Sequence, residues 1–132
     1  MKIRLTMFPA LLSALMICMP ATAHHNFRAE FDINIPVIVT GTVTRVALTN
    51  PHARLYLDVT NDDGSVTHWD FELAAASSLL RQGWKRDTLE VGDTIIVHAA
   101  RARNAPNVGN VEYVTLVNED GSEGFSFGSP RD

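Results

Sequence analysis

Residues 55–73, LYLDVTNDDGSVTHWDFEL, contain two short segments of alternating polarity on either side of a turn. In the first segment every second residue is apolar, namely Leu55, Leu57 and Val59. This period of two indicates a strand with one face in a core. The turn at residues 61–64 ends in Asp-Gly, which tolerates the positive φ angles of tight hairpins. The second segment has Trp69, Phe71 and Leu73 on one face, so the stretch predicts a β-hairpin.

Three more strands and one helix are predicted around this hairpin. Residues 37–48 are rich in Val and Thr, which favours a strand that bends or bulges at Gly41 and ends before Asn50-Pro51. Residues 74–82 favour a short helix, and Gly83 stands where a glycine commonly ends one. Strands are also predicted over residues 94–99 and 111–117, with a loop at 104–110 between them.

This order of elements predicts an all-β domain with one short helix. Five strands with a helix between the third and fourth match the OB-fold, a small five-stranded Greek-key barrel. A jelly roll needs more strands, and an immunoglobulin-type sandwich usually lacks the helix. We therefore predict an OB-like barrel over residues 24–117, followed by a loosely held tail over 118–132. The predicted core consists of Val43, Val46, Leu55, Leu57, Trp69, Phe71, Ile95 and Val97.

Residues 1–23 have the three parts of a secretory signal peptide. Lys2 and Arg4 give the positive start, residues 5–19 are almost all apolar, and Ala21-Thr22-Ala23 supplies small residues for cleavage. The apolar run is shorter than the about 20 residues of a membrane-spanning helix. The sequence therefore predicts cleavage before His24, a periplasmic location and no stable membrane span afterwards. An uncleaved anchor is the alternative.

Composition excludes several classes of function for the processed chain. The 132 residues include one cysteine and carry a net charge of -4, from 11 Lys and Arg against 15 Asp and Glu. Cleavage would remove Cys18 with Lys2 and Arg4, leaving 109 residues, no thiol and a net charge of -6. Disulfides, cysteine zinc sites and cysteine nucleophiles are then excluded. The acidic balance also argues against a nucleic-acid partner.

Two adjacent histidines would begin the processed chain. Cleavage would leave a free α-amine on His24, with the imidazole of His25 one peptide further on. Such nitrogen donors suit Cu(II), Ni(II) and Zn(II), and the arrangement is similar to the histidine brace of secreted copper proteins. A brace needs another histidine, and the accessible turn of His52 ranks before His68 and His98. The predicted metal site is His24, His25 and His52, with copper as the candidate cofactor; the alternative is solvated histidines without metal.

The polar face of the second hairpin strand carries a candidate catalytic set that is less specific than the predicted metal site. His68, Asp70 and Glu72 share that face and could serve acid-base chemistry, although alternating charges more often form a solvated surface. The sequence has no Ser-His-Asp order, glycine-rich phosphate loop or HExxH motif. We therefore predict a protein that is not an enzyme.

A basic and aromatic patch is predicted after the helix. Trp84 is flanked by Arg81, Lys85 and Arg86. This patch suits an anionic partner, although cations at a helix end also interact favourably with the helix dipole.

Four segments, together with the closing strand over residues 111–117, resemble a family of small secreted bacterial proteins, domain of unknown function 6152. They are HHNFRAEFD (24–32), GTVTRVALTNPHARLYLDV (41–59), WDFEL (69–73) and LLRQGWKRDTLEVGD (79–93). The His-His-x-Phe start, the Asn-Pro-His turn and the Gly-Trp-x-Arg-Asp segment are the most specific parts. Asn26 and Arg54 depart from the serine and the bulky apolar or aromatic residue that members commonly have.

The resemblance extends from His24 to about Val117 and implies export from a Gram-negative cell and a small β-barrel. It supplies no activity. It also implies a functional interest in His24, His25, Phe27, Asn50, Pro51, His52, Trp84, Arg86 and Asp87.

Two functional hypotheses follow. The first is a non-catalytic periplasmic OB-like binding module whose surface near the N-terminus and the Asn50-Pro51-His52 turn engages a small ligand or a metal ion. The second is an accessory or structural protein that docks on an envelope partner through Trp84, Arg86 and the tail. An enzyme built on the second hairpin strand ranks last.

Overall fold

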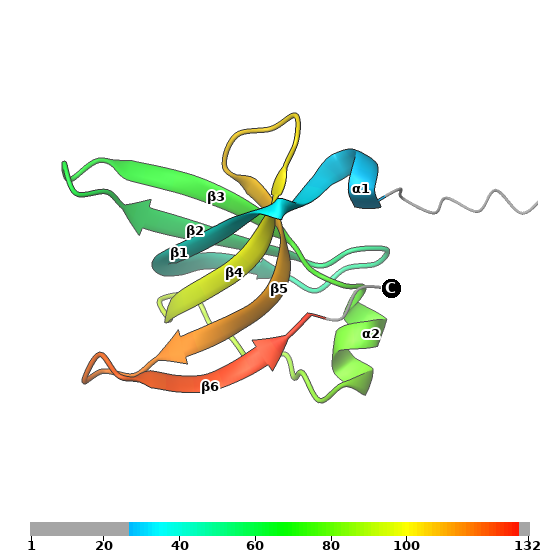
Figure 1. Cartoon of the computed structure of the whole chain (residues 1–132). Coiled ribbons are helices and arrows are strands. Elements are labelled where there is room, and N and C mark those ends of the chain that lie inside the picture. Colours follow the sequence, from blue (N-terminus) through cyan, green and yellow to red (C-terminus); the bar gives the residue numbers. More distant parts are fainter. Residues whose placement is uncertain (1–26, 130–132) are drawn as a thin grey trace, which may run out of the picture.

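A computed structural model of the chain describes residues 27–129 (Figure 1). The predicted signal peptide, His24, His25 and residues 130–132 lie outside this part. The elements in chain order are α1 (Phe27–Glu30), β1 (Phe31–Ala47), β2 (Arg54–Thr60), β3 (Val66–Glu72), α2 (Ala76–Arg81), β4 (Thr94–Ala102), β5 (Val108–Val117) and β6 (Glu123–Gly128). Between residues 27 and 129 no helix is long and apolar enough to span a membrane.

The strands form one sheet that curls into a barrel-like ring (Figure 1). Its order is β3-β2-β1-β4-β5-β6 with antiparallel neighbours, and a further parallel pairing joins β3 to β5 and closes the ring. α2 follows β3 in the chain, as the OB-like plan requires. The predicted fold class, mostly β with a short helix between the third and fourth strands, is confirmed.

β1 is longer than predicted because it pairs with two neighbours in turn. Its first part pairs with β4 and its last part with β2, and Thr42 belongs to both pairings. Gly41 lies at this change of partner, where an added Cβ would be 2.7 Å from the carbonyl oxygen of Asp58. The close approach of the two backbones requires a glycine. The bulge predicted at Gly41 lies instead between Val43 and Arg45.

The core fills the ring and agrees closely with the prediction. Every predicted core residue is buried except Val46 and Trp69, which are partly buried and pack against the core. Trp69 stacks on Phe71 with 5.2 Å between ring centroids. Each fully buried large apolar side chain contributes about 1.5–3 kcal/mol through removal of its surface from water.

The structure corrects part of the prediction of a loosely held tail, because residues 123–128 form β6. β6 pairs with β5, and Phe127 packs against the core with its ring centroid 5.4 Å from that of Trp84. The indole Nε1 of Trp84 donates to the carbonyl oxygen of Gly128 (3.1 Å), and the backbone N–H of Ala74 donates to the buried hydroxyl of Ser129 (2.9 Å). The composition of the tail indicated disorder, but these specific contacts hold it.

Trp84 is buried, so the prediction that it belongs to an exposed patch is wrong. After α2, Gly83 adopts a φ of 99° and donates its N–H to the carbonyl oxygen of Leu80, while the N–H of Trp84 reaches that of Leu79. This pair of bonds is a Schellman motif, which commonly brings the residue after the glycine into apolar contact with the last helical turn. Leu79 and Trp84 both belong to the core, with Trp84 only 5% exposed.

Candidate functional site

The β1–β2 loop, residues 48–53, holds the predicted turn and is tied to α2. The Asn50–Pro51 peptide bond is cis. α2 has no side-chain N-cap of its own, and its first N–H groups bond to this loop instead: Ala76 donates to the carbonyl oxygen of Thr49 (3.1 Å) and Ser77 to Oδ1 of Asn50 (3.3 Å). The unpaired N–H groups of a helix start need such acceptors. Asn50 therefore has a structural role in this loop.

A polar cluster joins His52 of this loop to side chains of β2, β3 and β5, namely Arg54, Asp70, Glu72 and Asn110; we call it the Arg54 cluster. Arg54 approaches both oxygens of Asp70 at 2.9 and 2.6 Å and Oε2 of Glu72 at 3.3 Å. The other oxygen of Glu72 accepts a 3.2 Å bond from Asn110 and lies 3.7 Å from Nδ1 of His52. The cluster fixes these side chains in one network.

Within the Arg54 cluster, the positive charge of Arg54 is paired with the carboxylates of Asp70 and Glu72. This pairing favours a structural role for the two carboxylates over a role in acid-base chemistry. Burial lowers the pKa of Arg54, but the hydrogen bond and charge of Asp70 and the charge of Glu72 raise that pKa above its usual value overall. His68, the third member of the predicted acid-base set, pairs with Asp58 instead, its Nδ1 2.6 Å from Oδ1. Asp70 and Glu72 share one guanidinium while His68 has a separate partner, so the structure does not assemble the set.

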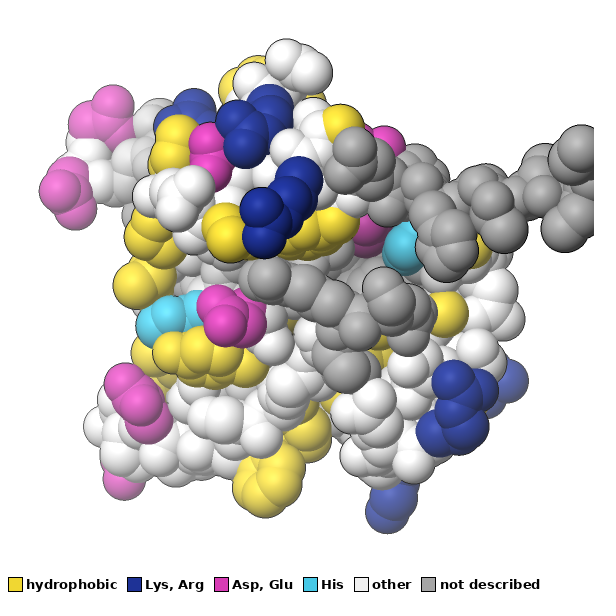
Figure 2. All heavy atoms as spheres, turned by 45° about the vertical axis from the view of Figure 1, so that its right-hand side comes forward, with side chains coloured by type: hydrophobic (Ala, Val, Ile, Leu, Met, Phe, Trp, Pro, Cys, Tyr) yellow, Lys and Arg dark blue, Asp and Glu magenta, His cyan; other side chains and the backbone are white. Residues whose placement is uncertain are grey.

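The other predicted surface residues lie apart from this loop. Phe27 begins α1 and stacks on Phe31, with 5.4 Å between ring centroids. Arg86 and Asp87 are exposed between α2 and β4, and among the described residues no hydrogen bond or ion pair joins them to the β1–β2 loop. Figure 2 shows the Lys and Arg side chains of one face in two separate groups, one at the height of the β4–β5 loop and one at the height of α2.

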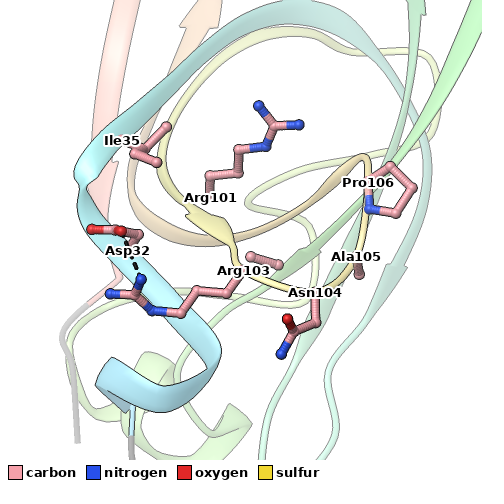
Figure 3. Close-up of a pocket in the computed structure, with 8 residues that line it drawn as sticks. Asp32, Ile35, Arg101, Arg103, Asn104, Ala105 and Pro106 are labelled. Atoms are coloured by element: carbon pink, nitrogen blue, oxygen red, sulfur yellow. Dashed lines mark ion pairs between the residues drawn. The ribbon is translucent and has the colours of Figure 1, made fainter.

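A cavity of about 540 Å³ beside the β4–β5 loop was not predicted from the sequence (Figure 3). Arg103 forms part of its wall, with Nη1 2.8 Å from Oδ2 of Asp32 and Nε donating to the carbonyl oxygen of Arg28 (2.9 Å). The backbone N–H of Asn34 lowers the pKa of Asp32, burial opposes this, and the charge of Arg103 lowers it further. In the sequence, this wall corresponds to Arg101-x-Arg103-Asn104 at the end of β4. The segment does not indicate a cavity by itself, because the cavity depends on Asp32, which is distant in sequence and lies opposite it.

The predicted metal site is represented here by His52 alone, because His24 and His25 lie outside residues 27–129. In that described part no three His, Cys, Asp or Glu side chains gather as a metal-binding group. His52 is 27% exposed and its carboxylate neighbour Glu72 is 12% exposed.

The closed ring, its short helix and its polar loops define a small OB-like domain. Residues 12–111 match the sequence profile of a family of unknown function, DUF6152, and the chain belongs to this family. The resemblance drawn from the four sequence segments is thereby confirmed. No curated protein and no solved structure matches the chain.

Proposed function

We propose that the protein is a non-catalytic periplasmic binding module that holds a transition metal ion, copper first among the candidates, between its processed N-terminus and His52. The observation that supports this proposal is the position of His52 on a loop tied to α2. The loop lies on the same side of the molecule as α1, where the described chain begins (Figure 1). α1 begins three residues after His24 in the sequence and lies on the side of the candidate histidine.

The chemistry of the donors favours copper. Cleavage before His24 would provide an amine and an imidazole on one residue, and His52 would add a second imidazole. Nitrogen ligands of this kind suit Cu(II), which binds such sites more tightly than the other divalent first-row metals. The carboxylate of Glu72 faces Nδ1 of His52 at 3.7 Å. A carboxylate that hydrogen-bonds a ligand ring orients it and fixes its tautomer, so a closer approach of Glu72 to Nδ1 on metal binding would leave Nε2 as the nitrogen that takes the metal.

Copper titration tests the proposal with three versions of the protein. They are the chain beginning at His24, the same chain with its N-terminal amine acetylated, and His52→Ala. We expect one Cu(II) per chain in the first, and affinity weakened at least about tenfold in the other two, a difference of about 1.4 kcal/mol. Electron paramagnetic resonance should report the largest number of nitrogen ligands in the first version and fewer in the other two.

His98→Ala is the matched control, because its ring stacks on Tyr113 of β5 at 4.2 Å, away from the β1–β2 loop. This variant should bind Cu(II) like the parent chain. Equal binding by all four proteins, or by none, contradicts the proposed site.

A docking role is the second candidate, and β6 supports it. Phe125 is 70% exposed there and lies 4.8 Å from the ring of Phe127. Trp84 cannot take part because it is buried, so docking would depend on Phe125 with the exposed Arg86 and Asp87. Crosslinking in cells would favour docking if Phe125→Ser lost a specific adduct that the His52→Ala variant kept.

A further inference from the structure

The cavity beside the β4–β5 loop forms where β1 bulges away from β4. Asp32 pairs with Arg101 and Pro36 with Ala100, so the three residues between Asp32 and Pro36 have no partners on β4. Ile35, from this bulge, and Pro106, from the loop, lie on opposite sides of the cavity (Figure 3). Its volume of about 540 Å³ falls within the roughly 300–1,000 Å³ typical of small-molecule sites.

Of the two guanidinium groups at the cavity, one is already neutralised. Arg103 is held by Asp32 and by the carbonyl oxygen of Arg28, and its backbone N–H donates to the carbonyl oxygen of Glu30 at 2.8 Å. These three bonds fix the start of the β4–β5 loop against α1 and β1. The wall of the cavity is therefore formed before any ligand arrives, which reduces the ordering cost of binding.

The other guanidinium is available to a ligand. Arg101 is exposed, and within residues 27–129 its side chain has no hydrogen bond or ion pair. Figure 3 shows it between Ile35 and Pro106, directed away from the Asp32–Arg103 pair. The cavity thus has a local excess of one positive charge in a chain of net charge -4. An unpaired guanidinium presents a planar fork that matches carboxylate and phosphate oxygens.

We propose that this cavity binds a small organic anion whose carboxylate or phosphate group pairs with Arg101 and whose apolar part lies against Ile35 and Pro106. Asn104, also on the wall, offers an amide to a further polar group. The site is distinct from the proposed metal site and does not depend on it.

Nuclear magnetic resonance titration of the ¹⁵N-labelled chain beginning at His24, with EDTA present, tests the proposal. The probes are benzoate, phenyl phosphate, the neutral benzamide and the cationic benzamidine, which share a ring and differ in charge. Benzoate or phenyl phosphate should shift the amides of residues 101–105 and 32–35, and the preferred group is the one that binds more tightly. Benzamide and benzamidine should leave these amides unchanged. Equal shifts from benzamide and benzoate, or no shifts there at all, would overturn the proposal.

Arg101→Gln provides the second test. Its affinity for the anionic probe should fall at least about tenfold, because hydrogen bonds to charged groups are the stronger ones. Arg101→Lys should keep part of the affinity, since it retains the charge and loses the fork. Arg81→Gln, which removes an exposed arginine from α2, should bind like the parent chain. Undiminished binding in Arg101→Gln contradicts the site, and the probe series on the unmodified protein decides the question if a variant fails to fold.

Discussion

Two hairpin turns of the molecule have nearly the same chemistry, at residues 61–65 (NDDGS) and 118–122 (NEDGS). In the first, the N–H of Asn61 donates to the carbonyl oxygen of Ser65 (2.8 Å), and the N–H and hydroxyl of Ser65 donate to Asp63 at 2.9 and 2.6 Å. In the second, Asn118, Asp120 and Ser122 make the same three bonds at 2.9, 2.9 and 2.6 Å. The glycines have φ angles of 82° and 81°.

The strands that the turns join differ. The first turn joins β2 to β3, two members of the ring whose Leu57 and Phe71 are fully buried. The second joins β5 to β6, and within residues 27–129 β6 pairs with β5 alone. The comparison teaches that a pentapeptide can set a turn, while the burial of the flanking strands sets how much the hairpin contributes to stability.

The largest difference in the free energy of unfolding between the two hairpins should come from truncating one apolar side chain in each. Phe71→Ala removes a fully buried ring and should destabilise the domain by about 3–5 kcal/mol. Phe127→Ala removes a partly buried ring and should cost roughly 1–2 kcal/mol. Urea unfolding followed by tryptophan fluorescence measures both. Equal losses would show that β6 is as much a part of the core as β3.

The next largest loss of stability should come from a substitution that weakens the attachment of β6 alone. Trp84→Phe keeps most of the packing and removes the indole bond to Gly128, which should cost about 0.5–1.5 kcal/mol. Hydrogen exchange should speed up in residues 123–128 and stay unchanged in β3. Acceleration across the whole ring would mean that β6 and the ring unfold as one unit.

Replacing the turn glycines by alanine should cost about 1 kcal/mol at each site, because both have positive φ. An added Cβ meets nothing within 4 Å at Gly64 or Gly121, so the cost is purely conformational. Gly128→Ala is the matched control, since it has equal space and its φ is not positive. Thermal melting of the three variants should leave only the control unchanged; a loss in the control equal to the others would refute the conformational explanation.

The smallest effect concerns the turn carboxylates and pH. The hydroxyl of the neighbouring serine, and then its backbone N–H, lower the pKa of Asp63 and of Asp120. A pKa lowered by folding adds stability above the unfolded value, and this stability is lost as pH falls through the folded value. Asp63→Asn and Asp120→Asn should therefore weaken the protein at about pH 7 and match it at about pH 2, below the usual carboxylate range. A gap that persists in acid would assign the effect to something other than ionisation.

Local patterns predicted much of the fold. The alternation around Leu57 and Phe71 gave the first hairpin, and Gly83 marked the end of α2. The same kind of reasoning could have found β6, since Asp120-Gly121 repeats the turn signal, and could have placed Trp84 in the core from its position after Gly83. The Gly- and Ser-rich composition of residues 118–132 obscures the turn signal, and the cations beside Trp84 obscure its apolar role.

The candidate site was less predictable. The Asn50-Pro51-His52 turn was singled out correctly as a loop, but the capping role of Asn50 depends on α2, which lies further along the chain. The cavity was missed altogether, because it requires Asp32 to lie opposite Arg101 and next to Arg103.

The sequence by itself determined the strands, the tight turns and the end of the helix, because each depends on residues that are neighbours along the chain. Only the tertiary structure decided that β3 pairs with β5, that the β1–β2 loop supports α2, and that Arg101 faces a cavity without a partner. These contacts join segments distant in sequence, and they become favourable only when burial of the shared core offsets the entropy of bringing those segments together.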